Sequence, residues 1–238
     1  MRSFTSPARL PLIAPSILSA DFARMGEDCR HILDPKQGDA DLLHLDVMDG
    51  HFVPNLTMGP DLCRALRRVL PDAFLDVHLM VTNPAQYVDP FADAGANHLT
   101  FHVEVTPNRK ALDTLVSHIR TRGMSAGIAV NPPTPIDRLW SLIKPDDGAG
   151  LDLVLVMSVN PGFSGQSFIG GVLEKTRAAR TAFGDTMRVQ MDGGVNLDTA
   201  PACREAGCDV IVAASAIFRE PPERRAGVVA ALRGSEGR

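Results

Sequence analysis

The stretch His44-Leu45-Asp46-Val47-Met48-Asp49-Gly50 has the pattern of a β-strand that carries polar groups into a protein interior. Residues two apart in a strand point to the same face. His44, Asp46 and Met48 therefore share one face, while Leu45 and Val47 share an apolar face suited to cover by helices. Burying an unpaired polar group costs ~1–3 kcal/mol, and an isolated charge costs more. A divalent metal would offset this cost, since imidazole and carboxylate are both metal ligands.

Two further segments repeat the arrangement. In segment 74–80 (FLDVHLM) His78 shares a face with Met80, and segment 189–194 (VQMDGG) ends a strand on a carboxylate. A single strand histidine is usually a satisfied core residue, and a single Asp-Gly is usually a turn. Four ligand-type residues near equivalent strand ends favour a metal site instead: His44, Asp46, His78 and Asp192.

The bulk properties argue against several functional classes. The chain has 238 residues, a formal net charge of −4 and a pI near 6.0, which is unlike a nucleic-acid-binding surface. No apolar run reaches the ~18–20 residues of a membrane span, and the first ten residues lack the apolar core of a secretory signal. Four cysteines without metal or redox spacing are expected to be buried thiols in a reducing compartment, the cytoplasm: Cys29, Cys63, Cys203 and Cys208.

Strand-like apolar runs alternate with helical patterns along the whole chain. Runs rich in Val, Leu and Ile predict strands near 11–17, 41–48, 73–79, 97–102, 125–130, 152–158, 187–192 and 209–213. Helices are predicted at 20–33, 60–69, 84–94, 108–121, 169–182 and 197–206, with a weaker one at 135–143 before a turn at 145–148. Helix 84–94 is expected to use Asn83 as its N-cap and to end at Gly95.

Eight strand–helix repeats predict an α/β protein with one domain over residues 1–238, a single (β/α)8 TIM barrel, which typically takes ~250 residues. The termini are expected to fray, for example at 234–238. A doubly wound open sheet is the structural alternative, but it often has a Gly-rich turn after its first strand, where this chain has segment 14–18 (APSIL). In a barrel the C-terminal strand ends meet at one mouth, where active sites lie. The four candidate ligands all fall at that mouth.

Three turns at the predicted mouth have the character of anion sites. Segment 159–166 (VNPGFSGQ) is a Gly-rich loop after the sixth strand, Gly193-Gly194 follows the seventh, and segment 214–218 (ASAIF) is expected to start a short helix after the eighth. Backbone N–H groups in such turns bind anions, and loops after strands seven and eight often hold phosphate in this fold. Each turn alone is usually structural. Their joint placement predicts a phosphate site, with 160–166 as a lid.

The residues at the predicted mouth resemble those of the ribulose-phosphate 3-epimerase family. The matching blocks are 14–18 (APSIL), 44–55 (HLDVMDGHFVPN), 77–81 (VHLMV), 156–163 (VMSVNPGF) and 190–196 (QMDGGVN). The resemblance extends over nearly the whole chain. It implies a (β/α)8 barrel that interconverts D-ribulose 5-phosphate and D-xylulose 5-phosphate with one divalent metal, in the pentose phosphate pathway, and it suggests a homo-oligomer.

The resemblance also implies roles for individual residues. Asp46 and Asp192 would be the two acid/base groups, and they would bind the metal together with His44 and His78. Substrate contacts are implied for Ser16, His78, Met48, Met80 and Met157, with the methionines as an apolar cap around the reacting carbons. The phosphate would be held by Gly162, Phe163, Ser164, Gly165, Gly193, Gly194, Ala214 and Ser215. Ser164 and Ala214 stand where the family commonly has Gly, and a side chain narrows the allowed backbone angles there.

The chemistry of C3 epimerisation explains why these groups are needed. A proton next to the C2 ketone is removed and one is returned to the opposite face. A divalent metal would stabilise the developing enediolate electrostatically, and two histidines with two aspartates admit Zn2+, Fe2+, Mn2+ or Co2+. Inversion needs a base on one face and an acid on the other, which Asp46 and Asp192 could provide from opposite sides of the ring. His102 and Glu104 end the fourth predicted strand, and a buried polar pair is expected there in preference to a role in supporting the site.

Three other functions would share some of these features. A 3-epimerase of a six-carbon ketose phosphate would use the same groups. A metal-free decarboxylase or synthase on a related barrel would carry an Asp-x-Lys-x-x-Asp arrangement, whereas this chain has Asp76-Val77-His78 and no lysine there. A non-catalytic sugar-phosphate-binding barrel would not need two inward carboxylates. The expected partner is a small sugar phosphate, with no nucleic acid and no membrane.

Overall fold

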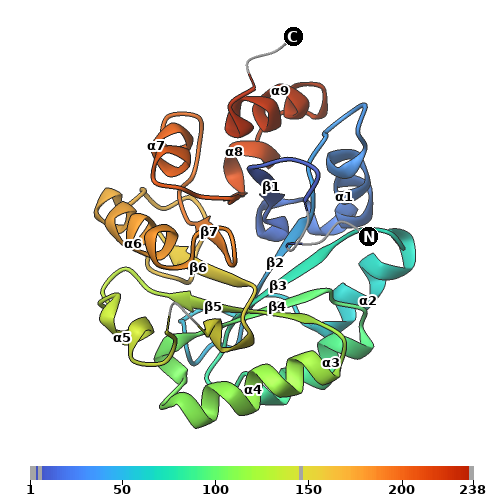
Figure 1. Ribbon diagram of the computed structural model, residues 1–238. Helices are drawn as coiled ribbons and strands as arrows, with labels where there is room; N and C mark the ends of the chain where they lie inside the picture. Colours follow the sequence, from blue (N-terminus) through green and yellow to red (C-terminus); the bar gives the residue numbers. More distant parts are fainter. Residues whose placement is uncertain (1–3, 5–6, 145–146, 236–238) are drawn as a thin grey trace.

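A parallel β-barrel forms the centre of the molecule. The computed structural model describes residues 4, 7–144 and 147–235. Within these residues, eight parallel strands form one sheet in the order β1-β8-β7-β6-β5-β4-β3-β2 (Figure 1). The strands are β1 (Leu12–Pro15), β2 (Leu43–Met48), β3 (Leu75–Met80), β4 (His98–His102), β5 (Ser125–Val130), β6 (Leu153–Met157), β7 (Arg188–Asp192) and β8 (Val210–Ala213). A bridge between Ser16 and His44 brings the two edge strands together, which confirms the barrel and excludes the open sheet.

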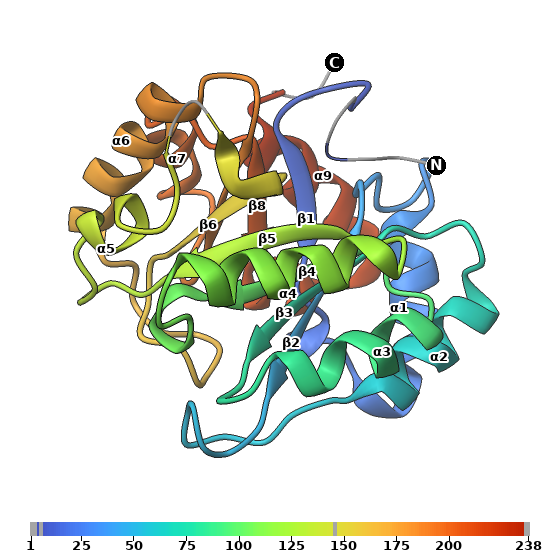
Figure 2. The same cartoon turned by 60° about the horizontal axis from the view of Figure 1, so that its bottom comes forward.

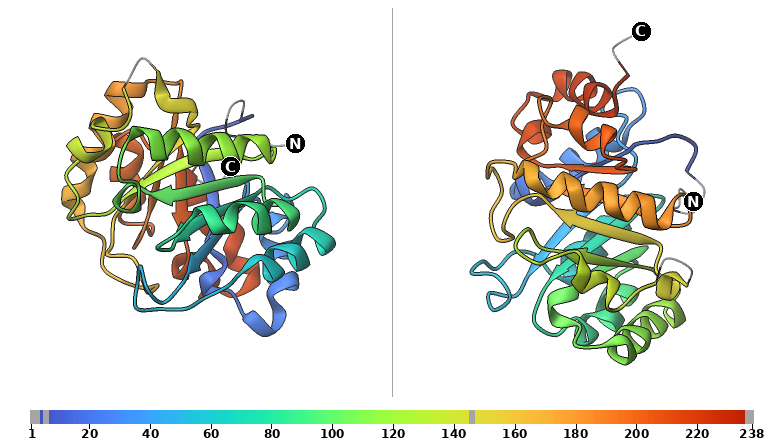
Figure 3. Two further views of the ribbon diagram at one scale, coloured as in Figure 1. Left: turned by 90° about the horizontal axis from the view of Figure 1, so that it is seen from below. Right: turned by 60° about the vertical axis from the view of Figure 1, so that its left-hand side comes forward.

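Helices surround the barrel on its outside, as Figures 1 and 2 and both views of Figure 3 show. They are α1 (Met25–Leu33), α2 (Pro60–Val69), α3 (Ala85–Asp93), α4 (Arg109–Thr121), α5 (Asp137–Trp140), α6 (Leu173–Phe183), α7 (Ala200–Glu205), α8 (Ser215–Phe218) and α9 (Pro222–Arg233). No helix among the described residues has the length and apolar character needed to cross a membrane.

The alternation in β2 separates two cores, as the sequence predicts. Leu43, Leu45 and Val47 join the large apolar layer between the strands and the helices. His44 and Asp46 are buried on the opposite face, inside the barrel. Parallel pairing of β2 with β3 places His44 opposite Asp76, Asp46 opposite His78 and Met48 opposite Met80. Polar groups on neighbouring strands are thereby brought within reach of one another.

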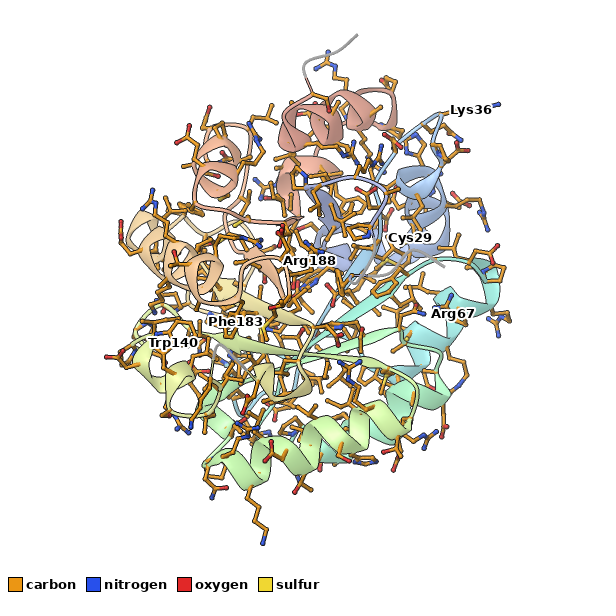
Figure 4. All side chains as sticks on the ribbon, viewed as in Figure 1. Cys29, Lys36, Arg67, Trp140, Phe183 and Arg188 are labelled. Atoms are coloured by element: carbon orange, nitrogen blue, oxygen red, sulfur yellow. The ribbon has the colours of Figure 1, made fainter. Side chains whose placement is uncertain are left out.

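The two ends of the barrel differ in character. Arg188 begins β7 and lies near the centre of the ring in Figure 4. It donates to the carbonyl of Phe4 at 2.8 Å, at the end of the barrel where the strands start. On the outside, the rings of Trp140 and Phe183, labelled in the same figure, lie with centroids 5.5 Å apart and join α5 to α6. The opposite end, where the strands finish, carries the candidate site.

Several predicted helices are shorter than expected because single 3₁₀ turns precede or replace their ends. Segment 20–33 starts with a 3₁₀ turn at Phe22–Arg24, and 169–182 starts with one at Gly170–Val172. In segment 135–143 only Asp137–Trp140 is α-helical. Segments 145–146 and 236–238, in the expected turn and frayed end, lie outside the described residues.

Two details of the helices differ from the sequence prediction. Asn83 does not cap α3, because Pro84 takes the cap position and no side chain caps the helix, although the chain turns at Gly95 with φ 87° as expected. Helix α9 was not expected from the sequence pattern. It is held by Val229 and Leu232 in the core and by Arg225, which donates to Asp28 of α1 at 2.7 Å.

Candidate active site

Four ligand-type side chains converge where the strands end. His44 and Asp46 come from β2, His78 from β3 and Asp192 from the last position of β7. One possible ligand atom from each lies within 4.8 Å of those from the other three. Asp46 Oδ1 lies 3.3 Å from His44 Nε2 and 3.0 Å from His78 Nδ1. Asp192 Oδ2 lies 3.8 Å from the same nitrogen of His78. This donor set and spacing can hold one divalent cation.

Asp76 fixes the ring of His44. Its Oδ2 lies 2.8 Å from His44 Nδ1 and accepts a second hydrogen bond, also of 2.8 Å, from Gln190 Nε2. All three side chains are completely buried. With its Nδ1–H donated to Asp76, His44 points Nε2 toward the cluster, where that atom has no hydrogen-bond partner and can offer a lone pair once its proton is displaced by a cation. Asp76 therefore selects the tautomer that can bind a cation through Nε2.

His78 is fixed on its other side by a second histidine. Its Nε2 lies 2.8 Å from His102 Nε2, and His102 Nδ1 lies 3.1 Å from Glu104 Oε2. The pair expected between His102 and Glu104 is therefore present, but it also touches a candidate ligand. Burial lowers the pKa of His78 to about 4, so this ring is neutral near pH 7 and available as a ligand.

The two carboxylates of the cluster have opposite pKa shifts in the absence of a cation. Burial favours the neutral form of Asp46, but His44 and His78 outweigh this effect and hold its pKa well below the usual value. Burial and the charge of Asp46 raise the pKa of Asp192 to about 7. Burial lowers the pKa of His44, but the charges of Asp46 and Asp76 raise it well above the usual value. Without a cation, one carboxylate is thus ionised while the other can carry a proton near neutrality.

A cavity of about 330 Å³ opens beside this cluster. Asp46 and Asp192 both line it, so they can face one bound molecule. Ser16 also lines it and donates to Asp46 Oδ2 at 2.5 Å. The remaining residues expected at the site line the same cavity: Met48, Met80, Met157, Gly162, Phe163, Ser164, Gly165, Gly193, Gly194, Ala214 and Ser215. His44 and His78 are completely buried within the cluster.

The turn after β7 accepts only glycine. Gly193 and Gly194 have φ of 116° and 63°, which L-residues rarely adopt. A Cβ on Gly193 would lie 2.6 Å from Val159 Cγ2, and one on Gly194 would lie 2.7 Å from the carbonyl oxygen of Gln166. The absence of side chains lets this turn pack closely against the loop at 159–166, and both segments border the cavity.

Ser164 and Ala214, expected from the resemblance to stand in place of glycine, do not have positive φ. Among the described residues, the non-glycine positions with positive φ are Asp39 and Ala149. Ala214 has φ −108° and precedes α8, which begins at Ser215 as the sequence predicts. A side chain at Ser164 or Ala214 is therefore compatible with the observed conformation.

The loop at 160–166 is attached to the barrel at few points. Asn55 Nδ2 donates to the carbonyl of Gly162 at 2.6 Å. Gln166 Nε2 donates to the carbonyls of Asn160 and Phe163, so these bonds lie within the loop itself. The side chain of Phe163 is more than half exposed. A loop tied mainly to itself can open without disrupting the core.

Sequence reasoning missed four residues that shape the site. Asp76 and Gln190 lie two positions before His78 and Asp192 on the same inward faces, so the alternation that revealed those ligands also marked these two. Ser158 Oγ contacts the carbonyl oxygens of Asp192 and Gly193 at 2.9 and 2.5 Å and fixes the end of β7. Arg219 lines the cavity, with Nη2 3.7 Å from where a Cβ on Gly165 would lie. Ser158 stands in the block 156–163 that carries the family resemblance, but no role was expected for it, and nothing in the local sequence marked Arg219.

Comparison with known proteins identifies the family. A model of the "Ribulose-phosphate 3 epimerase family" matches residues 12–218. A ribulose-phosphate 3-epimerase of Serratia marcescens is 45% identical over 217 residues, covering 90% of this chain and 98% of that protein. One of Bacillus subtilis is 43% identical over 228 residues, covering 94% and 99%.

Solved structures show the same fold at low sequence identity. The crystal structure of a 3-hexulose-6-phosphate synthase from Salmonella typhimurium has a TM-score of 0.69 and 15% identity, with 94% of this chain and 97% of that chain covered. This likeness concerns the barrel alone. The level of identity to the two epimerases over almost their whole length shows more: this chain is an enzyme that belongs to the ribulose-phosphate 3-epimerase family.

Proposed function

We propose that this enzyme interconverts D-ribulose 5-phosphate and D-xylulose 5-phosphate by a metal-dependent, two-base mechanism. The observation that carries the proposal is the pair Asp46 and Asp192, which line one cavity within a cluster of four possible metal ligands. Two carboxylates that reach one cavity from different strands suit a reaction that removes a proton from one face of a carbon and returns one to the other. Family membership supports the same substrate pair.

The residues present fit a divalent metal. His44 Nε2 is buried without a hydrogen-bond partner, His78 is neutral, and Asp46 supplies a carboxylate to both. His44, His78, Asp46 and Asp192 would hold the ion, and this donor set admits Zn2+, Fe2+, Mn2+ or Co2+. When bound, the metal would supply electrostatic stabilisation of the negative charge that develops as the proton leaves.

Asp46 and Asp192 would move the proton at C3. Ser16 donates to one oxygen of Asp46 and so orients this carboxylate toward the cavity. Asp192 is held by the end of β7, whose carbonyl groups are fixed by Ser158. Met48, Met80 and Met157 would close around the reacting carbons, because an apolar flexible side chain excludes water without a rigid wall.

Backbone groups would bind the phosphate at the other end of the cavity. Gly193, Gly194, Ala214 and Ser215 line the cavity, and so does the lid segment Gly162–Gly165, including Phe163 and Ser164. The guanidinium of Arg219 adds a positive charge, and no ion pair to it is present among the described residues. Charge-assisted hydrogen bonds from such a group suit a phosphate dianion.

The wider setting follows from the same proposal. The chain would form one barrel domain, would act in the pentose phosphate pathway in the cytoplasm, and would assemble as a homo-oligomer. Four buried, unpaired cysteines support a reducing compartment. A relative from rice carries the words "cytoplasmic isoform" in its name.

An epimerase assay on both pentulose phosphates tests the proposal. We expect interconversion in both directions, loss of activity after treatment with a strong chelator, and recovery when Zn2+, Fe2+, Mn2+ or Co2+ is restored. Full activity in a sample shown to be metal-free would contradict the proposed metal dependence. A higher kcat/KM on a six-carbon ketose phosphate would assign the enzyme to that substrate instead, and no turnover of either would favour a binding function.

Cobalt binding should stabilise the fold through the proposed ligands. At a concentration about 100 times its Kd, Co2+ should raise stability by ~2.7 kcal/mol, equivalent to a Tm increase of roughly 5–10 °C. His44→Asn and His78→Asn should lose most of this increase. His98→Asn is the matched control, because His98 is also completely buried in the barrel but contacts Ser125 and Thr100. Equal increases in all four proteins, measured by calorimetry, would contradict the assigned ligands.

Asp192→Asn should stop inversion while one proton exchange continues. The family resemblance makes Asp46 the acceptor for ribulose 5-phosphate, so this epimer alone should slowly gain deuterium at C3 in D2O, without net epimerisation. Mass spectrometry follows the label, and the metal content is measured in the same preparation with excess metal supplied. Near wild-type interconversion by the metal-loaded variant would rule out the two-base mechanism.

Arg219→Met should weaken substrate binding without slowing the chemical step. Loss of one charge-assisted contact should raise KM about three- to tenfold, or ~0.6–1.4 kcal/mol, and should change kcat less than twofold. Arg224→Met is the control, since Arg224 is an exposed arginine that does not line the cavity and lies 4.0 Å from the carboxylate of Glu220. An unchanged KM for Arg219→Met would remove this side chain from the phosphate site.

A further inference from the structure

Three ionisable side chains form a continuous hydrogen-bonded chain that leads away from the candidate metal site. His78 Nε2 lies 2.8 Å from His102 Nε2, and His102 Nδ1 lies 3.1 Å from Glu104 Oε2. His78 and His102 are completely buried. We propose that Glu104 is a positioning residue that acts through His102 to hold His78 in the tautomer whose Nδ1 lone pair faces the cation. This inference rests on the metal site of the proposed function.

The geometry of the two rings suits a directed hydrogen bond. Their centroids are 5.0 Å apart and their planes differ by 25°, so the N–H of one ring can point along the in-plane lone pair of the other. The ring of Phe52 lies 4.7 Å from that of His102 on another side. Thr106 Oγ1 donates to the backbone carbonyl of His102 at 3.0 Å. His102 is therefore held in place independently of its contact with His78.

Glu104 determines which atoms donate in the hydrogen bonds that link it to His102 and His78. Its Oε1 accepts the backbone N–H of Asn131 at 2.9 Å, which leaves Oε2 for His102. Burial raises the pKa of Glu104, but the hydrogen bonds, first of all that to His102, outweigh burial and lower it to about 2, so the group is an ionised carboxylate near neutral pH. An ionised carboxylate accepts hydrogen bonds and donates none. The proton of His102 must therefore lie on Nδ1.

The remaining protons follow from this one. A neutral His102 with its proton on Nδ1 has a lone pair on Nε2, which can accept the Nε2–H of His78. His78 then has a lone pair on Nδ1, the atom 3.0 Å from Asp46 and 3.8 Å from Asp192. The alternative, with the His78 proton on Nδ1, would leave a lone pair on His78 Nε2, and His102 would then have to donate from both of its ring nitrogens at once. With protons on His102 Nδ1 and His78 Nε2, the Nδ1 lone pair of His78 therefore faces the cation site.

Each of the two candidate histidine ligands is oriented by a carboxylate, His44 through a direct contact and His78 through a second histidine. His44 is directly paired with Asp76 and presents Nε2. His78 presents Nδ1, so its supporting carboxylate must be reached from Nε2, and His102 spans the gap to Glu104. A carboxylate that fixes a histidine ligand commonly changes metal affinity 10–100-fold when it is lost.

Glu104→Gln tests this direction of hydrogen bonding, because glutamine has nearly the same size and shape as glutamate. The amide oxygen can still accept the N–H of Asn131, but the amide NH2 group then faces His102 Nδ1 and requires a lone pair there. His102 would carry its proton on Nε2, and His78 would be driven to protonate Nδ1, the proposed ligand atom. We expect the Kd for Co2+, measured by competition with a chromophoric chelator, to rise about 10–100-fold.

Thr106→Val is the matched control. It removes a hydrogen bond at the backbone of His102 and leaves the three-residue chain intact, so its Kd for Co2+ should stay within about threefold of wild type. Equal Kd values for wild type and Glu104→Gln would overturn the positioning role while leaving the metal site standing. A wild-type protein that binds no Co2+ would overturn both this inference and the metal site.

Nitrogen NMR examines the wild-type protein directly, whether or not the variant folds. In Zn2+-loaded protein labelled with 15N-histidine, two-bond correlations should show a proton on Nδ1 of His102 and on Nε2 of His78. A proton on Nε2 of His102, or a doubly protonated ring, would overturn the proposal. In Glu104→Gln the His102 proton should move to Nε2.

Discussion

The burial of ionisable side chains inside the barrel is the constraint on which the rest of the structure depends. Pairing of β2 with β3 sets His44 opposite Asp76 and Asp46 opposite His78. A shift of one residue in this register would turn both polar pairs toward the helices and bring leucine and valine inside. The same register therefore builds both the barrel core and the site, because the polar groups of each strand find partners on the other strand.

Each buried charge in the cluster is stabilised by a partner of opposite sign. Without a cation, the carboxylates of Asp46 and Asp76 hold a proton on His44, and Asp192 retains a proton near neutrality. A divalent ion would displace these protons and take their place, which couples metal binding to proton release. Removing a single member would leave the others buried and unpaired, and such losses typically cost ~3–5 kcal/mol. The cluster is thus both a possible reaction centre and a condition for the stability of the mouth of the barrel.

Patterns of period two and of helical spacing predicted most of the fold. All eight strands lie within two residues of the expected bounds, because the pattern that marks a strand depends only on residues next to one another in the sequence. Helix α9 was missed because Val229, Leu232 and Arg225 are all buried there, so no clean apolar face appears in the sequence. The 3₁₀ turns were missed because tertiary contacts set the local ends of helices.

The candidate site divides along a similar line. Residues on inward strand faces could be found from alternation, and even Asp76 and Gln190 carried that signal. Ser158 and Arg219 could not, because their roles depend on how loops after different strands meet in space. The contact of His102 with His78 could not be found from the sequence either. The sequence suggests a polar pair of His102 with Glu104, but only the packing of β3 beside β4 shows that this pair reaches His78.

The division between strands and loops also separates chemistry from binding. The proposed acid/base and metal groups stand on β2, β3 and β7, whereas the proposed phosphate contacts lie mainly in loops, which include Ser164 and Ala214. Neither position has a positive φ, so a side chain is tolerated at both. Position 78 does not have this freedom. A lysine at position 78 would place an ammonium group where Asp46 and Asp192 converge. Its charge would compensate the carboxylates that the proposed cation needs, and the Nδ1 ligand of His78 would be lost, so the proposed metal site requires a neutral nitrogen ligand at this strand position.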